Sequence, residues 1–213
     1  KIFVTPLAVD PLYQSPPSKT ALKLVKEKYH LPDKFVLAVA GGPNPNKNLP
    51  LLAQATQDLN LPLVLVGGGL TQQLPRKIHP ELKDLALLKT YDHLILPGFV
   101  DTQELNALYR LATLYCQPSL YEGFGLPLLE AMTAKCLVVS SSTSSLPEIY
   151  APETLTFDPR SLTSLCTTLK QALTLSPSEY QKHISTNYTQ AQAFTWAKTA
   201  SLTAEVYRSV LSL

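Results

Sequence analysis

The sequence predicts an α/β fold in which a Rossmann-like parallel sheet is flanked by helices, with extra helices at the C-terminal end. Short apolar runs recur along the first two thirds of the chain and are continuous rather than alternating, which is typical of strands buried on both faces. Helical patterns separate these runs, and such alternation favours a parallel sheet with helices on both faces. The last third of the chain contains helical patterns alone.

The apolar runs are expected to form the strands in chain order. They are KFVLAVA (34–40), LPLVLV (61–66), HLILP (93–97), TLYCQPS (113–119) and CLVVS (136–140). Helices are expected over 46–59, over 101–112 and from Leu126 or Pro127 onward, and then over 161–175, 178–192 and 195–212. Asp101 is expected to cap the second helix, because Glu104 follows at capping-box spacing. The apolar side of the last helix, with Trp196 before it, is expected to be core or to pack on a further domain.

The composition bounds the class of protein. A chain of 213 residues with 45% hydrophobic content can bury one sizeable core, so we expect one domain over residues 1–213. A net charge of +2 without a basic block gives no case for a nucleic-acid partner. Cys116 and Cys136 lie in apolar runs and are expected to be buried, reduced thiols, which suits a cytoplasmic protein. No apolar run reaches the roughly 18 residues that span a bilayer, and no secretory signal is visible.

The glycines gather at one edge of the predicted sheet. All 8 lie between Gly41 and Gly125, and each group falls near the C-terminal end of a predicted strand. Ligands of open parallel sheets bind at that edge, where glycine lets the backbone approach them closely. The sequence therefore predicts a ligand crevice there, and its loops are Gly41–Gly42, Gly67–Gly69, Gly98 and Gly123–Gly125.

Several ligand classes are disfavoured by what these loops lack. The dinucleotide fingerprint G-x-G-x-x-G and the P-loop pattern are both absent, and no acid ends the second strand to hold a dinucleotide ribose. A metal cluster is disfavoured because His30, His79, His93 and His183 are scattered, and no Asp-x-Asp pair is present for a metal-bound diphosphate.

The stretch YEGFGLPLLEAM (121–132) points to a phosphate and to sugars. Its glycines lead into a helix whose free amides and dipole form an anion site, and Lys47 can add a full positive charge at the same edge. Glu130, about one turn into the helix, can accept two hydrogen bonds from a vicinal diol such as a ribose. Glu122 can accept hydrogen bonds from the hydroxyls of a second sugar across the phosphates.

The sequence resembles a known family, the C-terminal, donor-binding domain of GT-B fold glycosyltransferases, in the large retaining group called family 4 or group 1. Glu122 and Glu130 match its E-x7-E motif. NKNLPLLAQA resembles the lysine-bearing loop and helix, and LVLVGGG and ILPGFVDTQELNALYRLATLYCQPSLYEGFG fit the segments that follow. KIFVTPLAVD resembles the segment that enters the domain, and FTWAKTASLTAEVYRSVL resembles its closing helix. The resemblance is collinear over nearly the whole chain.

The resemblance implies roles for the matching residues. The substrate would be a UDP- or GDP-linked sugar, with no cofactor and no obligatory metal, and its hexosyl unit would be transferred with retention of configuration. Glu130 would bind the ribose, Lys47 would contact the phosphates and Glu122 would help hold the donor sugar. The remaining expected contacts are the amides of Gly123, Phe124, Gly125 and Leu126 for the sugar and diphosphate, the backbone near Val100 for the base, and the crevice glycines Gly41 and Gly42.

Two departures from the family pattern stand out. Members often carry an arginine a few residues before the lysine, but the stretch from Gly41 to Asn46 has no basic residue, and Arg76 and Lys77 are candidates to replace it. The family also needs an N-terminal domain that binds a saccharide or lipid-linked acceptor, and we expect that domain to be absent from this chain. The isolated chain should therefore bind the donor but transfer little, and the missing domain could bring it to a membrane surface.

Two other interpretations stay open at this stage. The first is a noncatalytic nucleotide-sugar-binding or scaffold module on the same fold, which the missing arginine favours weakly. The second is a nicotinamide-dependent oxidoreductase, which would have to bind its dinucleotide without the usual fingerprint.

Overall fold

A single parallel sheet forms the centre of the molecule. The computed structural model describes residues 2–42, 44–71, 83–88 and 90–211. The sheet has the order β3-β2-β1-β4-β5-β6, with all of its strand pairs parallel. The strands are β1 (Val36–Val39), β2 (Leu63–Val66), β3 (Leu94–Gly98), β4 (Leu114–Gln117), β5 (Val138–Ser141) and β6 (Leu155–Phe157). This is the doubly wound order of Rossmann-like folds, so the predicted fold class is confirmed.

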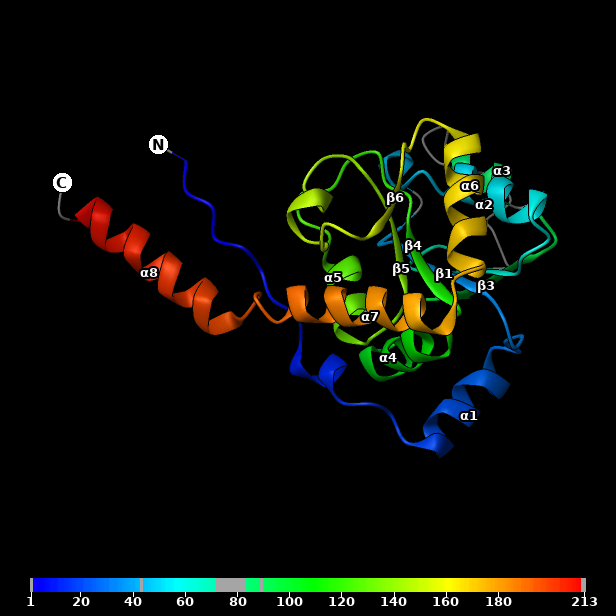
Figure 1. Ribbon diagram of the computed structural model, residues 1–213, viewed down its shortest axis with the longest axis horizontal. Coiled ribbons are helices and arrows are strands. Elements are labelled where there is room, and N and C mark those ends of the chain that lie inside the picture. The colour runs from blue at the N-terminus through cyan, green and yellow to red at the C-terminus, as the bar shows by residue number, and fades with distance from the viewer. Residues whose placement is uncertain (1, 43, 72–82, 89, 212–213) are drawn as a thin grey trace.

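Helices cover both faces of this sheet (Figure 1). They are α1 (Lys19–Lys28), α2 (Leu49–Asp58), α3 (Lys83–Leu88), α4 (Thr102–Leu111), α5 (Leu126–Thr133), α6 (Leu162–Leu173), α7 (Pro177–Ala191) and α8 (Trp196–Leu211), with the short 3-10 helices η1 (Pro11–Gln14), η2 (Pro45–Lys47) and η4 (Leu146–Glu148). All five predicted strands are present. The sequence did not predict β6 or α3, which are too short to give a periodic signal.

The alternation of strand side chains builds two cores. Val36 points to the face covered by α2 and α6, and the next residue, Leu37, points to the face covered by α1, α4 and α5. Both side chains are almost completely buried. Burial on both faces explains why the strands read as continuous apolar runs.

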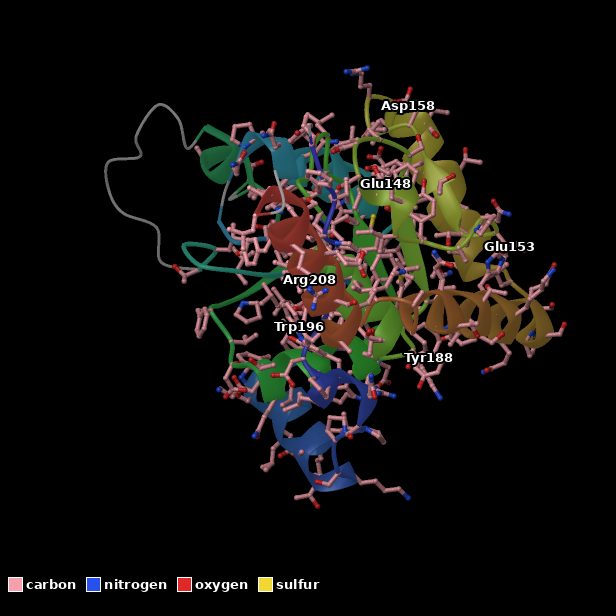
Figure 2. The ribbon with its side chains drawn as sticks, turned by 90° about the vertical axis from the view of Figure 1, so that its left-hand side faces the viewer. Glu148, Glu153, Asp158, Tyr188, Trp196 and Arg208 are labelled. Atoms are coloured by element: carbon pink, nitrogen blue, oxygen red, sulfur yellow. The ribbon has the colours of Figure 1, made fainter. Side chains whose placement is uncertain are left out.

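The C-terminal helices behave differently from each other. The capping box of Ser176 and Glu179 begins α7, which packs against α5. By contrast, α8 has no buried residue and projects from the domain, and Trp196 at its start is 52% exposed. Figure 2 shows the molecule from the side on which α8 projects, with Trp196 and Arg208 of this helix labelled. The expectation that α8 belongs to this domain's core is wrong, because none of its residues is buried.

The N-terminal segment lies beside the start of α8. The Thr199 hydroxyl donates a hydrogen bond of 2.6 Å to the carbonyl oxygen of Pro6. Ile2 and Val4 in this segment are largely exposed. In the described part of the chain, no helix is long and apolar enough to cross a membrane.

Candidate functional site

The glycine loops after β1 and β2 meet at the C-terminal edge of the sheet. A methyl group on Gly67 would lie 1.7 Å from the carbonyl oxygen of Ala40, so only glycine lets these two strand ends approach so closely. A methyl group on Gly42 would lie 3.6 Å from the Gly68 oxygen, which places the two loops side by side. The predicted convergence of glycine loops at this edge is therefore present.

A cavity of about 440 Å³ opens between these loops and the starts of α4 and α5. Its volume lies in the range of small-molecule sites. It is lined by Val39, Ala40, Gly41, Val66, Gly67, Gly68, Phe99, Val100, Leu105, Leu126, Pro127 and Glu130. Four predicted site residues, Gly41, Val100, Leu126 and Glu130, thus share one cavity, in which Glu130 is the acidic residue.

Glu130 is held by two tyrosines at the wall of this cavity. Its Oε2 atom accepts a hydrogen bond of 2.9 Å from the Tyr109 hydroxyl, and the Tyr13 hydroxyl lies close enough to the carboxylate to favour its charged form. Burial raises the pKa of the Glu130 carboxyl above its ordinary value, and the two tyrosine hydroxyls oppose that rise because they favour the ionised form. Neither tyrosine was predicted from the sequence, because the residues around each one give no sign that its partner lies on α5.

Lys47 and Glu122, far apart in the sequence, form an ion pair. The distance from Lys47 Nζ to Glu122 Oε1 is 2.7 Å, and the two side chains are 20% and 11% exposed. Glu122 Oε1 also accepts hydrogen bonds from Gln117 Nε2 at 2.7 Å and from Ser119 Oγ at 2.6 Å. Three donors therefore fix one carboxylate oxygen. Gln117 and Ser119 were not predicted as site residues. Two polar residues at the end of an apolar strand could have indicated that they lie at the ligand edge of the sheet.

The loop from Glu122 to Gly125 is fastened to the loop after β5. Ser144 Oγ accepts a hydrogen bond from the Glu122 amide and donates one to the Glu122 carbonyl oxygen, at 3.0 and 2.6 Å. Ser145 Oγ donates to the carbonyl oxygens of Glu122 and Phe124. The Phe124 ring packs edge-on against Phe194, with ring centroids 5.9 Å apart. These bonds leave the loop little freedom, so its backbone amides have a defined direction.

Helix α5 begins without a capping side chain. Gly125 at its N-cap has φ +114°, and no side chain accepts a hydrogen bond from the first-turn amides. Side-chain oxygens cap α1, α4, α6 and α7. The uncapped amides of α5, together with the helix dipole, favour an anion at this position. Gly123 lies in the same loop, and a methyl group there would meet open space.

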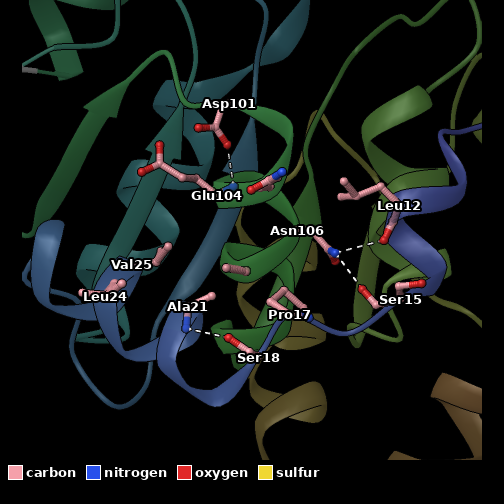
Figure 3. A pocket seen from close by; sticks show the side chains of 12 residues that line it. Leu12, Ser15, Pro17, Ser18, Ala21, Leu24, Val25, Asp101, Glu104 and Asn106 are labelled. Carbon is pink, nitrogen blue, oxygen red and sulfur yellow. Dashed lines mark hydrogen bonds between the residues drawn. The ribbon is translucent and has the colours of Figure 1, made fainter.

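A second cavity, of about 410 Å³, lies between η1, α1 and α4 (Figure 3). None of the predicted site residues and no glycine lines it. Its helix starts are already capped, since Ser18 Oγ accepts from the Ala21 amide and Asp101 Oδ1 accepts from the Glu104 amide. The cavity at the glycine loops is therefore the better candidate for an anionic ligand.

Some sequence predictions are not tested by this geometry. Arg76 and Lys77, considered as substitutes for the missing arginine, lie outside the described residues, as does His79. Among the described residues, no three His, Cys, Asp or Glu side chains gather in a way that could hold a metal ion, and metal-independent chemistry stays a prediction. Cys116 and Cys136 are buried free thiols, as expected, and Cys166 is a partly buried one.

Sequence comparison identifies related proteins. The family model described as "Glycosyl transferases group 1" matches residues 20–191. The chain is 34% identical over 204 residues to the serotype-specific mannosyltransferase WbdA of Escherichia coli, covering 91% of this chain and 24% of that protein. It is 30% identical over 216 residues to O-antigen chain mannosyltransferase B of Escherichia coli, covering 98% of this chain and 54% of that protein. The chain thus spans between a quarter and about half of these relatives.

Structural comparison gives the same fold. Sucrose-phosphate synthase from Thermosynechococcus elongatus superposes with a TM-score of 0.77 at 23% identity, over 98% of this chain and 52% of that chain. Anabaena Alr3699/HepE in complex with UDP and glucose superposes with a TM-score of 0.74 at 16% identity, over 100% of this chain and 57% of that chain. At these identities the similarity concerns the fold alone.

Proposed function

Because the chain belongs to the group 1 glycosyl transferases and is a domain of GT-B type, we propose that it is the donor-binding domain of a retaining enzyme. The enzyme would transfer a hexosyl unit from a UDP- or GDP-linked sugar to a saccharide or lipid-linked acceptor. One observation carries this proposal. The cavity lined by Glu130 lies at the start of α5, where the first-turn amides have no capping side chain. Glu122, in the loop that leads into this helix, forms an ion pair with Lys47.

Each part of this arrangement has a chemical task in the proposed reaction. Cleavage of the glycosidic bond leaves negative charge on the departing diphosphate. Lys47 and the first-turn amides of α5, with Leu126 among them, would stabilise that charge as it forms. These positive groups would stabilise the leaving diphosphate in place of a metal ion. The Glu130 carboxylate would accept hydrogen bonds from the ribose, and the backbone around Val100 would face the base.

Glu122 is better suited to positioning the donor sugar than to attacking it. Its Oε1 atom already accepts three hydrogen bonds, from Lys47, Gln117 and Ser119. A carboxylate held in this way keeps its geometry, and it can still accept hydrogen bonds from sugar hydroxyls at Oε2. Since both relatives described above are named mannosyltransferases, a mannosyl donor is the first candidate.

The acceptor would be bound by an N-terminal domain outside this chain. Helix α8 has no buried residue, and the N-terminal segment beside it exposes Ile2 and Val4. Unpartnered apolar surface of this kind marks a contact with another protein surface. We propose that both segments pack on the acceptor domain, that the isolated chain binds donor without transferring sugar, and that the whole enzyme works in the cytoplasm, held at a membrane surface through that domain.

A thermal-shift titration with UDP, GDP, ADP and NAD tests the proposal. A ligand that binds only the folded state adds about 2.7 kcal/mol of stability at a hundredfold excess over Kd. We expect UDP or GDP to raise the melting temperature, and Glu130→Ala to remove the rise. Glu153→Ala, which removes an exposed glutamate from a distant loop, is the matched control.

The outcomes separate the alternatives. No rise with any nucleoside diphosphate would contradict the proposal, and a rise with NAD alone would favour an oxidoreductase. The noncatalytic module would be favoured if the donor binds but no transfer occurs after an acceptor domain has been joined to the chain. The lack of a basic residue between Gly41 and Asn46 is the observation that keeps this second function under test.

A further inference from the structure

Two buried tyrosines from separate elements converge on the Glu130 carboxylate. Tyr109, on α4, is completely buried and donates a hydrogen bond of 2.9 Å to Glu130 Oε2. Tyr13, on η1, is 3% exposed, and its hydroxyl lies close enough to the same carboxylate to interact with it. The two rings pack edge-to-face, with centroids 5.9 Å apart. This contact limits the rotation of both rings, and the Tyr109 hydroxyl is directed at Glu130.

Tyr13 is itself fixed by several polar contacts. Asp10 caps η1 by accepting a hydrogen bond from the Leu12 amide at 2.8 Å. The Asn106 side-chain amide donates to the carbonyl oxygens of Leu12 and Ser15, as Figure 3 shows. Arg110 Nη2 donates to the Tyr13 carbonyl oxygen at 2.9 Å. Two polar side chains of α4 therefore hold the short helix that delivers Tyr13.

The number of hydrogen bonds suits a diol ligand. An ionised carboxylate offers about four acceptor positions. The Tyr109 hydroxyl occupies one of them and the Tyr13 hydroxyl lies near the same group. Even if both hydroxyls use a position, two remain, as many as a vicinal diol can use. A carboxylate without these donors would be free to rotate and would be harder to keep ionised in its buried position.

We propose that Tyr13 and Tyr109 are positioning residues for ribose recognition: they set the direction of the Glu130 carboxylate toward the cavity. This inference rests on the proposed function, because it assigns the diol to the ribose of a nucleoside diphosphate. The tyrosines act through Glu130 and do not touch the ligand. The segment before α1, in which no ligand-binding motif is visible, thereby contributes to donor binding.

Binding measurements on the whole chain test the inference. Calorimetric titration with UDP and GDP is compared for the wild type, Tyr13→Phe, Tyr109→Phe and Glu130→Gln. Each phenylalanine variant is expected to bind about 3- to 10-fold more weakly, the effect of losing one hydrogen bond. The loss should be smaller for 2′-deoxy-UDP and 2′-deoxy-GDP, because these ligands lack one of the two ribose hydroxyls.

A matched control and a double variant separate positioning from simple destabilisation. Tyr91→Phe removes a half-buried phenol that also donates to a side-chain oxygen, Gln54 Oε1 at 3.0 Å, on another part of the fold, and it should leave binding unchanged. In the Glu130→Gln background, Tyr109→Phe should have little further effect, because the group that it positions has already been altered. A merely structural role would weaken binding of ribo and 2′-deoxy ligands equally.

A second readout needs no ligand. NMR titration of the Glu130 side-chain carboxyl carbon should show a higher pKa in Tyr13→Phe and Tyr109→Phe than in the wild type, because each variant loses a donor to the ionised form. Unchanged binding and an unchanged carboxyl titration in both variants would overturn the inference, while the proposed function would stand if Glu130→Gln still abolished binding. Failure of the wild-type chain to bind either diphosphate would overturn the proposed function and this inference together.

Discussion

Two glycines of one loop are expected to differ sharply in how much stability the chain loses when each is replaced by alanine. Gly125 has φ +114°, a conformation that side chains rarely adopt, and an added methyl group would lie 2.7 Å from Leu146 Cδ2 and 3.3 Å from Ile149 Cδ1. Leu146 and Ile149 are almost completely buried and have little room to move. At Gly123, two residues earlier, an added methyl group would have no atom within 4 Å, and the φ angle of this residue is not positive.

The cost of Gly125→Ala follows from these contacts. Backbone strain at such a φ costs about 1 to 3 kcal/mol, and overpacking of a filled core costs about 1 to 3 kcal/mol more. We therefore expect a loss of about 2 to 5 kcal/mol in the free energy of unfolding, which lowers Tm by roughly 5 to 15 °C for a chain of this size. Gly123→Ala should change stability by no more than about 0.5 kcal/mol.

Urea unfolding followed by far-ultraviolet circular dichroism measures both variants, with Tm from calorimetry as a second value. Gly123→Ala should keep its stability while binding a nucleotide-diphosphate sugar more weakly, because its methyl group enters the open space beside Glu122. Equal losses of stability in the two variants would refute the reasoning. So would a Gly125→Ala protein that melts within a degree of the wild type.

Three further predictions concern the charges and thiols. Glu130→Gln should melt higher than the wild type at neutral pH, because burial raises the pKa of Glu130 in the folded state. The neutral carboxyl contributes stability below the ordinary glutamate pKa, and this contribution is lost as pH rises through the raised pKa. A calorimetric pH series should show this gap closing in acid, and a pH-independent gap would contradict the reasoning. Lys47→Met should cost about 1 to 3 kcal/mol by losing its charged hydrogen bond to Glu122, and a double-mutant cycle with Glu122→Gln should show that the two changes are coupled. In native protein a thiol reagent should modify Cys166 first, because the other two cysteines are buried, and mass spectrometry of the labelled peptides would show any other order.

The candidate site is expected to combine affinity for its proposed ligand with a cost to stability. Glu130 is half-buried, which raises the pKa of its carboxyl, and the Lys47–Glu122 pair lies mostly out of solvent. Replacing a half-buried carboxylate that has no cationic partner, or a whole buried ion pair, with neutral groups commonly stabilises a protein and removes its function, whereas removing one partner of a pair destabilises it. The opposite signs expected for stability and binding in Glu130→Gln would identify this carboxylate as a functional rather than a structural group.

Much of the fold and part of the site were predictable from local sequence. Five strands and most helices are visible because period and apolar runs depend on residues only a few positions apart. The glycine loops follow from strand ends, and the stretch 121–132 marks an uncapped helix start through its own glycines. Strand β6 escaped prediction because it has three residues, the middle one exposed.

Only the tertiary structure decided which distant groups meet. Lys47 and Glu122 are 75 positions apart, and they pair because parallel crossovers place β1 beside β4. Tyr13 reaches Glu130 because Asn106 and Arg110 hold η1 against α4. The exposure of α8 could not be predicted from its amphipathic pattern either, because such a pattern shows that a helix has an apolar face but not what covers that face. The sequence thus determined the elements and the chemistry carried by each one, while their partners depended on strand order and packing, which bring together residues that no local pattern connects.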